Sequence, residues 1–301
     1  MQDPAWIAVD WGTSNVRAWA MGPGDTVLAE AKSEDGVGKM AGRDFEDALL
    51  TLIGGWLGDG STDIVICGMA GARNGWVEAP YRAVPCEPPV NVTVPVLTRD
   101  RRLKARVIPG LKQVSPADVM RGEETQIAGY LASNPKFGGI LCLPGTHSKW
   151  AHISAGEVVS FRTFMTGDLF AALSKHTILS ATVADANGED REAFLDGVRE
   201  ILSKPETIGS ALFSIRAETL LNAQSADTGA ARLSGLLIGA ELAASRPYWL
   251  GQEVVLIGAE GLSNRYLDAL AAQGVSARLA PSCDMTLAGL GAARATQRTN
   301  A

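Results

Sequence analysis

The chain has 301 residues, which is enough for two domains of ordinary size. It carries 27 Lys and Arg against 33 Asp and Glu, a formal net charge of −6 that argues against a general nucleic-acid-binding protein. Hydrophobic residues make up 46%, but no stretch approaches the roughly 18 uninterrupted apolar residues of a membrane span, and no signal-peptide pattern is visible. We therefore expect a cytoplasmic protein with neither nucleic acid nor a membrane as partner.

The four cysteines lie far apart in the chain, without a Cys-x-x-Cys pair, and there are only three histidines. This spacing indicates neither a disulfide framework nor a zinc site. The cysteines are Cys67, Cys86, Cys142 and Cys283; three of them have apolar or strand-like neighbours, so burial is the simpler interpretation there.

The first thirty residues predict three short strands joined by two turns. The strands are expected at 6–10, 16–20 and 26–30. The first turn, 11–15, contains Gly and Thr, and the second, 22–25, has the Gly and Pro residues of a hairpin loop.

A second unit with the same pattern occurs 133 residues later, where Gly145-Thr146 corresponds to Gly12-Thr13. Its strands are expected at 139–143, 149–153 and 158–162, around a turn at 144–148. Only the first unit carries an aspartate before its turn, Asp10, where the second has Leu143. The pattern predicts an internal duplication.

The remaining elements are read from hydrophobic periodicity. Strands are predicted at 63–67 and 253–257, the second followed by a Gly-x-x-Gly turn at 258–261. Helices are predicted at 44–53, 123–132, 169–174, 191–202, 208–222, 230–244, 264–273 and 284–296. The region 72–110 is rich in proline loops and fits part of a substrate site, a homodimer surface or a solvated edge; these alternatives stay open.

Two Gly-Thr turns that each follow an apolar strand offer backbone N–H and hydroxyl donors that could hold an oligophosphate from both sides of a cleft. The chain has no Walker sequence, and Gly289-Leu-Gly291 lacks the strand that a dinucleotide fold needs. The candidate phosphate ligands are Gly12, Thr13, Ser14, Asn15, Gly145, Thr146, His147 and Lys149. For Lys149, phosphate contact and a solvent-facing side chain are both open.

Asp10 ends the first strand at the edge of this expected cleft, where a carboxylate would repel phosphates unless a divalent cation lay between them. Mg²⁺ is the natural ion, because it binds one or two carboxylates together with phosphate oxygens. The alternative is an ordinary strand-end aspartate.

A kinase also needs a carboxylate that orients the acceptor hydroxyl and takes its proton. Glu123, directly after Arg121-Gly122, is the predicted base. Glu124 is expected instead to complement the helix dipole at an exposed N-terminus, and the choice between the two glutamates stays open.

These motifs resemble those of the acetate/sugar kinase, heat-shock protein 70 and actin superfamily. Asp10-Trp-Gly-Thr13 resembles its first phosphate motif, Pro144-Gly-Thr-His-Ser148 its second, Leu256-Ile-Gly-Ala-Glu-Gly261 its adenosine motif and 285–294 its closing helix. The resemblance implies an α/β, two-lobed actin-like ATPase (ribonuclease H-like) fold with duplicated mixed sheets and an interdomain cleft. It implies an N-terminal, sugar-acid-binding lobe at 1–120, rejoined by the helix 284–301, and a nucleotide-binding lobe at 121–283.

Within that group, four segments resemble the 2-dehydro-3-deoxygalactonokinases: 7–19, 121–126, 143–150 and 164–167. The resemblance implies transfer of the γ-phosphoryl group of ATP, with Mg²⁺, to the 6-hydroxyl of 2-dehydro-3-deoxy-D-galactonate in D-galactonate catabolism. The chain departs from general sugar kinases in offering Glu123 or Glu124 where they carry aspartate. Two alternatives are a kinase for another sugar or sugar acid and a non-catalytic, actin- or chaperone-like ATP switch.

An acidic substrate requires cationic or N–H donors for its carboxylate and keto oxygen. The candidate substrate ligands, besides Glu123, are Gly36, Val37, Ala70, Gly71, Arg73 and Trp76, although Trp76 also fits a core anchor under a loop. The resemblance adds Thr166 and Gly167 as nucleotide contacts, with Asp168 as an alternative helix N-cap. Gly258, Gly261 and Asn264 are expected beside the adenosine.

Overall fold

A computed structural model describes residues 3–299, which group into two units by their internal contacts. Unit 1 contains Met1–Phe137, Ser154–Ser160 and Ser282–Ala301, and unit 2 contains Gly138–Ile153 and Phe161–Pro281. The division falls after Phe137, whereas the sequence analysis placed it at residue 120. The terminal segment rejoins unit 1 from Ser282, and residues 300–301 of the expected helix lie outside the described part.

The sheet of unit 1 is mixed, with the buried strand β1 (Trp6–Trp11) near its centre. β1 pairs antiparallel with β2 (Val16–Met21) and parallel with β4 (Thr62–Gly68), and the full order is β3-β2-β1-β4-β7-β6. The other strands are β3 (Val27–Ser33), β6 (Val94–Pro95) and β7 (Leu103–Val107). The three strands expected in the first thirty residues are therefore confirmed.

The sheet of unit 2 repeats this arrangement, with the order β12-β11-β10-β13-β14. Its strands are β10 (Gly139–Leu143), β11 (Ser148–Ser154), β12 (Glu157–Phe164), β13 (Val254–Gly258) and β14 (Ala277–Pro281). β10 is antiparallel to β11 and parallel to β13, as β1 is to β2 and β4. The predicted duplication is thus confirmed at the level of sheet topology.

The two hairpins differ in register by one residue. Asp10 lies opposite Arg17, seven residues on, whereas Leu143 lies opposite Lys149, six residues on. A single shift of 133 residues therefore superposes the first strands but misplaces the second ones. The reason is that the second turn is shorter, which no residue pattern in the strands reveals.

Unit 1 also contains helices α1 (Phe45–Ile53), α2 (Glu123–Ser133) and α10 (Ser282–Thr299). α2 and α10 contact each other extensively, and α10 adds Leu290 and Ala293 to a core that includes Trp6 and Trp19. Residues 72–110, whose role the sequence left open, contain β5 (Arg82–Ala83), which forms a small third sheet with β8 (Leu111–Gln113) and β9 (Asp118–Met120), two strands that follow this region. Short 3₁₀ turns lie at Pro23–Asp25, Val37–Lys39, Gly54–Trp56, Met69–Gly71 and Pro89–Asn91.

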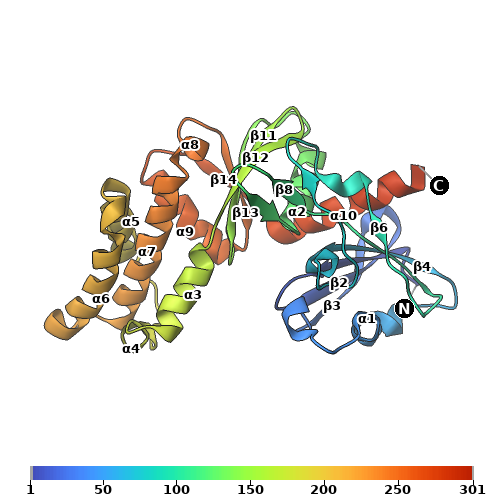
Figure 1. Ribbon diagram of the computed structural model, residues 1–301, viewed down its shortest axis with the longest axis horizontal. Helices are drawn as coiled ribbons and strands as arrows, with labels where there is room; N and C mark the ends of the chain where they lie inside the picture. Colours follow the sequence, from blue (N-terminus) through green and yellow to red (C-terminus); the bar gives the residue numbers. More distant parts are fainter. Residues whose placement is uncertain (1–2, 300–301) are drawn as a thin grey trace. The chain divides into compact units, whose positions relative to one another are not determined.

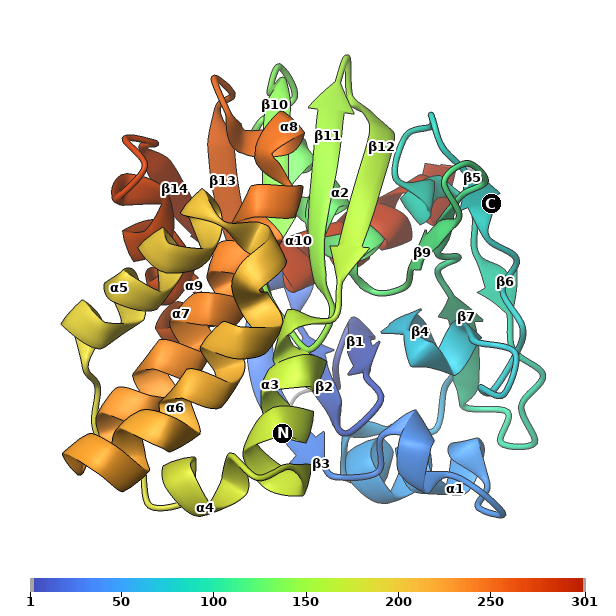
Figure 2. The same ribbon diagram turned by 60° about the vertical axis from the view of Figure 1, so that its left-hand side comes forward.

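Unit 2 covers its sheet with helices, of which α7 is central: it contacts α3, α4, α5, α6, α8 and α9 (Figures 1 and 2). The approach of α5 to α7 is close, because a Cβ atom on Gly235 would lie 2.1 Å from the carbonyl oxygen of Phe194. The helices are α3 (Thr166–His176), α4 (Ser180–Val183), α5 (Arg191–Ser203), α6 (Ile208–Asn222), α7 (Ala226–Ala244), α8 (Arg246–Trp249) and α9 (Glu260–Ala271), with a 3₁₀ turn at Pro205–Thr207. Among residues 3–299, none of the helices combines the length and apolarity of a membrane span.

Two further sequence interpretations are tested by the fold. All four cysteines are free thiols, and Cys67, Cys86 and Cys142 are buried as expected. α9 begins at Glu260 rather than at Asn264, so Gly261 and Asn264 are helical residues. The prediction of a Gly-x-x-Gly turn over 258–261 is therefore wrong, because the chain is already helical after Ala259. Glu260 at the first position favours this earlier start, because an acid there complements the helix dipole.

Candidate active site

The first Gly-Thr turn connects β1 to β2 and is closed by a hydrogen bond from the Gly12 N–H to the Asn15 carbonyl, 2.9 Å long. Thr13, Ser14 and Asn15 are exposed. The Gly36–Val37 segment packs directly on this turn: the Val37 N–H donates to the Gly12 carbonyl, and a Cβ on Gly36 would lie 2.3 Å from the Ser14 carbonyl carbon. The structure therefore brings the first phosphate candidates together with two of the substrate candidates.

Asp10 stands at the end of β1, beside this turn, with 22% of its side chain exposed. Its Oδ2 accepts a hydrogen bond of 2.7 Å from Nη2 of Arg17, while Oδ1 faces the weak Sγ donor of Cys67 at 3.8 Å. Oδ1 therefore has lone pairs available to bind a cation. A hard ion that needs one carboxylate and completes its shell with water and phosphate fits this donor, and no cluster of three or more His, Cys, Asp or Glu ligands occurs among the described residues.

The segment after β4 holds the other substrate candidates of unit 1. Ala70 and Gly71 are buried and Arg73 is exposed. The segment folds back on itself, since the N–H groups of Trp76 and Val77 both donate to the Ala70 carbonyl. Trp76 packs against Trp11 and Phe45, with ring centroids 6.0 and 6.3 Å apart, which favours the core-anchor interpretation of this residue.

Glu123 and Glu124 open α2 in very different surroundings. Glu124 is fully buried, and burial, followed by the charge of Glu123, raises the pKa of Glu124 to about 8. Both of its oxygens accept from the Gly122 N–H, at 2.9 and 2.7 Å. The expectation that Glu124 lies at an exposed helix end is therefore wrong. Glu123 is half-buried and accepts from the Arg121 N–H at 3.1 Å.

Arg121 is a residue to which the sequence analysis gave no role. Its Nη2 donates to the Ala79 carbonyl at 2.8 Å, and its guanidinium lies 4.3 Å from the ring centroid of Tyr81. Nε and Nη1 are buried without a hydrogen-bond partner in the described structure. A Cβ on Gly71 would lie 2.6 Å from Nη1, so the glycine makes room for this cation. The available signal was its position directly before Gly122-Glu123.

The second Gly-Thr turn, in unit 2, is held by the start of α3. A Cβ on Gly167 would lie 2.6 Å from the Gly145 carbonyl oxygen, and the Asp168 N–H donates to the Thr146 carbonyl at 3.1 Å. His147 Nε2 lies 3.2 Å from Asp168 Oδ2. Asp168 is thus inside the first turn of α3 and is not its N-cap, a position that Met165 takes. Four of the nucleotide candidates, Gly145, Thr146, His147 and Gly167, meet here.

Lys149 and Thr166 are buried, so their side chains face inward rather than solvent. Lys149 Nζ donates a hydrogen bond of 2.9 Å to the His147 carbonyl and so stabilises the turn. The Thr166 hydroxyl donates to a carboxylate oxygen of Glu241. Of the adenosine candidates, Gly258 is buried, and a Cβ atom on it would lie 3.4 Å from Pro144 Cδ. Gly261 and Asn264 are exposed on α9.

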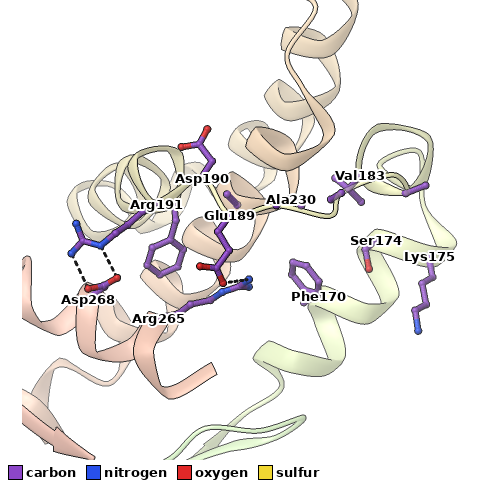
Figure 3. A pocket seen from close by; sticks show the side chains of 15 residues that line it. Phe170, Ser174, Lys175, Val183, Glu189, Asp190, Arg191, Ala230, Arg265 and Asp268 are labelled. Atoms are coloured by element: carbon purple, nitrogen blue, oxygen red, sulfur yellow. Dashed lines mark hydrogen bonds and ion pairs between the residues drawn. The ribbon is translucent and has the colours of Figure 1, made fainter. Parts of the chain in front are cut away.

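Two neighbouring pockets in unit 2 share Phe170 and Arg265. The smaller, of about 100 Å³, is lined by Gly145, Thr166 and Gly167, together with Leu262, Tyr266 and residues of α7. The larger, of about 430 Å³, is a size typical of small-molecule sites. Figure 3 shows Phe170 and Arg265 projecting toward it, with the ion pair of Arg191 and Asp268 at one side.

Phe170, Ser234 and Arg265 also line these pockets, and none of them was predicted from the sequence. Arg265 Nη1 donates to the Ser234 hydroxyl at 3.3 Å, and Nη2 lies 4.0 Å from Glu189 Oε1. All three residues lie within helices, where the spacing of apolar residues indicates only which side of the helix is buried. No local signal distinguishes them from ordinary helical residues.

Comparison with known proteins places this geometry in a family. The model of the 2-keto-3-deoxy-galactonokinase family matches residues 10–293. A probable 2-dehydro-3-deoxygalactonokinase of Rhizobium meliloti is 41% identical over 70% of this chain and 71% of its own, and the 2-dehydro-3-deoxygalactonokinase of Escherichia coli is 35% identical over 70% of each.

Solved structures agree with this assignment. A protein from Sinorhizobium meliloti with the provisional name 2-dehydro-3-deoxygalactonokinase is 39% identical, with a TM-score of 0.90 over 96% of this chain and 97% of its own. The activator of 2-hydroxyisocaproyl-CoA dehydratase from Clostridium difficile is 12% identical, with a TM-score of 0.53 over 98% and 96% of the chains, and shares the fold. The chain is an α/β protein of the actin-like type and belongs to the 2-keto-3-deoxy-galactonokinase family.

Proposed function

We propose that this chain phosphorylates 2-dehydro-3-deoxy-D-galactonate at its 6-hydroxyl, using ATP and Mg²⁺, in D-galactonate catabolism. The products are 2-dehydro-3-deoxy-6-phosphogalactonate and ADP. The observation that carries the proposal is the family match over residues 10–293, because this span includes every residue to which we assign catalysis or binding. The cytoplasmic location, the absence of nucleic-acid and membrane partners and a homodimer stay predictions.

Unit 2 is the proposed nucleotide-binding part. Gly145, Thr146 and Gly167 would bind phosphate oxygens through backbone N–H groups, which offer donors without the bulk of side chains. The adjoining pockets would take the ribose and base, with the ring of Phe170 and the guanidinium of Arg265 offering flat surfaces to a purine. Gly258 ends the neighbouring strand β13, and Gly261 and Asn264 lie in the first two turns of α9.

Asp10 is the proposed ligand of Mg²⁺, through the carboxylate oxygen that Arg17 does not occupy. Mg²⁺ bound to phosphate oxygens would offset the negative charge on the transferred group. Arg17 holds the other oxygen and so fixes the orientation of the carboxylate. Gly12, Thr13, Ser14 and Asn15 would contact the phosphate from unit 1.

Glu123 is the proposed general base. It would accept the proton of the 6-hydroxyl as that oxygen bonds to the γ-phosphorus, while the bond from the γ-phosphorus to the bridging oxygen breaks and ADP leaves. Glu124 cannot serve in its place, because its carboxyl group is fully buried and has no surface that an acceptor could reach.

The acceptor's carboxylate and keto oxygen would be bound by donors of unit 1. Arg73 is an exposed cation, and the Gly36–Val37 and Ala70–Gly71 segments provide backbone groups nearby in the fold of that unit. Trp76 would act indirectly, by shaping the Ala70–Gly71 segment through its contacts with Trp11 and Phe45.

A coupled assay of ADP release tests the proposal. Purified protein with ATP and MgCl₂ is offered 2-dehydro-3-deoxy-D-galactonate, its gluconate epimer and plain hexoses. Fast turnover on the galactonate form alone supports the proposed reaction and substrate. Preference for another acceptor would replace the substrate, and ADP binding without turnover on any acceptor would favour the ATP-switch alternative.

A further inference from the structure

A carboxylate lies buried among the elements that carry the proposed nucleotide ligands. Glu241 of α7 is only 2% exposed. Burial raises the pKa of Glu241, and hydrogen bonds from Thr166, Trp150 and Tyr266 act in the opposite direction. A buried carboxylate costs free energy unless donors surround it, and apolar residues of similar size often stabilise a core as well or better. The donors around Glu241 therefore point to a purpose other than stability.

Each donor comes from a different element. Oε1 accepts a hydrogen bond of 2.7 Å from Nε1 of Trp150, in β11. Oε2 accepts from the Tyr266 hydroxyl of α9 at 2.7 Å and from the Thr166 hydroxyl at the start of α3. Ser148 extends the network, since its hydroxyl lies 2.9 Å from that of Tyr266. One carboxylate thus joins four elements of unit 2.

The bond to Thr166 has a direct consequence for the proposed phosphate site. The N-cap of α3, Met165, provides no side-chain hydrogen bond, so Glu241 supplies an anchor for the first helical residue that the cap does not. The next residue, Gly167, lies against the Gly145 carbonyl and the Thr146 Cα, with no room for a Cβ. A shift of Thr166 would therefore change the distance between the two segments that line the smaller pocket.

We propose that Glu241 is a positioning residue for the nucleotide: by holding the Thr166 hydroxyl, it keeps Gly167 at a fixed separation from the Gly145–Thr146 turn. Tyr266 holds Oε2, the oxygen that Thr166 also binds, whereas Trp150 binds only the other oxygen, Oε1. Glu241 touches no phosphate. This inference rests on the proposed function only in taking unit 2 as the nucleotide-binding part.

A double-mutant cycle with Glu241→Gln and Thr166→Val tests the proposal. Both replacements keep the side chain's size and remove or weaken the same hydrogen bond. We measure the dissociation constant of ADP by titration calorimetry without any acceptor, and then KM for ATP, KM for the acceptor and kcat. Each single variant is expected to weaken ADP binding about tenfold, the size of effect that outer partners of a binding site exert. The double variant should be no weaker than either, because the two changes remove one interaction.

Trp150→Phe is the matched control for loss of stability. It removes the donor to Oε1 but leaves Tyr266 to hold the oxygen that faces Thr166. We expect its melting temperature to fall, with the ADP dissociation constant and KM for ATP within about twofold of the parent. KM for the acceptor should stay within about twofold in all variants that fold, because the acceptor residues are assigned to unit 1.

Three results would overturn the proposal: unchanged ADP binding in Glu241→Gln, additive effects in the double variant, or an equal loss of affinity in Trp150→Phe. If Glu241→Gln does not fold, Thr166→Val decides alone, and unchanged ADP binding in that variant refutes the inference. A parent protein that binds ADP but phosphorylates none of the acceptors refutes the kinase proposal and leaves this cycle measurable. A parent that does not bind ADP refutes both.

Discussion

Glu123 and Glu124 are adjacent and chemically identical, yet the structure gives them opposite environments. Glu124 is fully buried and Glu123 is half-buried. The sequence could identify the pair, because two acids follow Arg121-Gly122 at a helix start. It could not assign their roles, because which side of α2 faces the core depends on α10, more than 140 residues away.

Replacing Glu123 by Gln is expected to lower kcat by two to four orders of magnitude, roughly the contribution of a general base, with little change in KM for ATP. Glu124→Gln is the matched variant, and we expect it to retain most of kcat because its carboxyl group is inaccessible. Steady-state kinetics of both variants at saturating ATP provide the comparison. A large loss of kcat confined to Glu124→Gln would transfer the base assignment to that residue.

Glu124 should also make the stability of the protein depend on pH. Its pKa is about 8 in the folded protein and near 4.5 in an unfolded chain, so between these values the folded state holds a proton that the unfolded state has lost. Stability from this group is therefore full below pH 4.5 and falls as the pH rises toward 8, by several kcal/mol in total.

Urea unfolding of the parent and of Glu124→Gln at pH 5, 6.5 and 8 measures this contribution. The difference in free energy of unfolding should shift steadily in favour of the variant as the pH rises, because glutamine does not titrate. Titratable groups that do not interact with Glu124 cancel in the difference. Parallel pH profiles for the two proteins would contradict the assignment.

Asp10→Asn tests the metal role at the end of β1. The amide keeps the shape but is a much poorer ligand for Mg²⁺, so we expect loss of Mg²⁺-supported turnover, about 10³-fold, with a smaller effect on ADP binding. A titration of activity against MgCl₂ is the measurement. Arg17→Met is the comparison, since it frees the other carboxylate oxygen without removing the carboxylate. Normal Mg²⁺ dependence in Asp10→Asn would refute the metal role.

At the scale of elements, the sequence predicted those whose local signals are strong. The strands of both duplicated units, and helices such as 191–202 and 208–222, lie where periodicity placed them, within a few residues. Six strands were missed, β5 to β9 and β14. The two longest are β7, whose buried positions are separated by Lys104 and Arg106, and β14, a short run with Arg278 and Pro281. Their pairing partners β4 and β13 make them strands, and pairing is not visible in a short polar segment.

The contact of α2 with α10 depends on two glycines, one on each helix. A Cβ on Gly129 would lie 1.9 Å from the Met285 carbonyl oxygen, and one on Gly289 would lie 2.0 Å from that of Thr125. Such distances involve backbone atoms, which can move apart only if the helices separate. The pair therefore sets the spacing of the two helices within unit 1.

Gly289→Ala is accordingly expected to destabilise the protein by about 3 kcal/mol through overpacking. Gly291→Ala, two residues further along α10, is the matched control. Its Cβ would meet Asp25 Oδ2 at an ordinary 3.4 Å, so the better helix propensity of alanine should leave stability unchanged or raise it by up to about 1 kcal/mol. Guanidinium unfolding of both variants gives the comparison, and equal effects would contradict the close-packing argument.

For the whole molecule, the duplication was predictable from pattern, but the boundary between the units was not. The resemblance implied a second lobe from residue 121, which would include α2, whereas the extensive contacts of α2 with α10 group it with unit 1. The tip of the second hairpin, Ser154–Ser160, is also grouped with unit 1, where Val158 bridges Cys86. Such assignments depend on contacts between segments that are far apart in the chain, and local sequence patterns do not reveal these contacts.

Hydrogen–deuterium exchange can test the division of labour between the units. ADP should slow exchange in unit 2, at the Gly145–Thr146 turn, the start of α3 and the start of α9. The sugar acid should slow exchange in unit 1, at Gly36–Val37 and Ala70–Gly71, because bound ligands stabilise the amides they contact. Protection by ADP confined to unit 1 would reverse the proposed assignment.

The late return of the chain to unit 1 has a consequence for its synthesis. Trp6 and Trp19 belong to a core that Leu290 and Ala293 complete. On the ribosome, every residue of unit 2 emerges before α10 does, so unit 2 has its full complement of residues first. The indole rings of Trp6 and Trp19 therefore border an open apolar face until Ala293 has been synthesised, and during that time the nascent N-terminal sheet is exposed to non-native hydrophobic contacts.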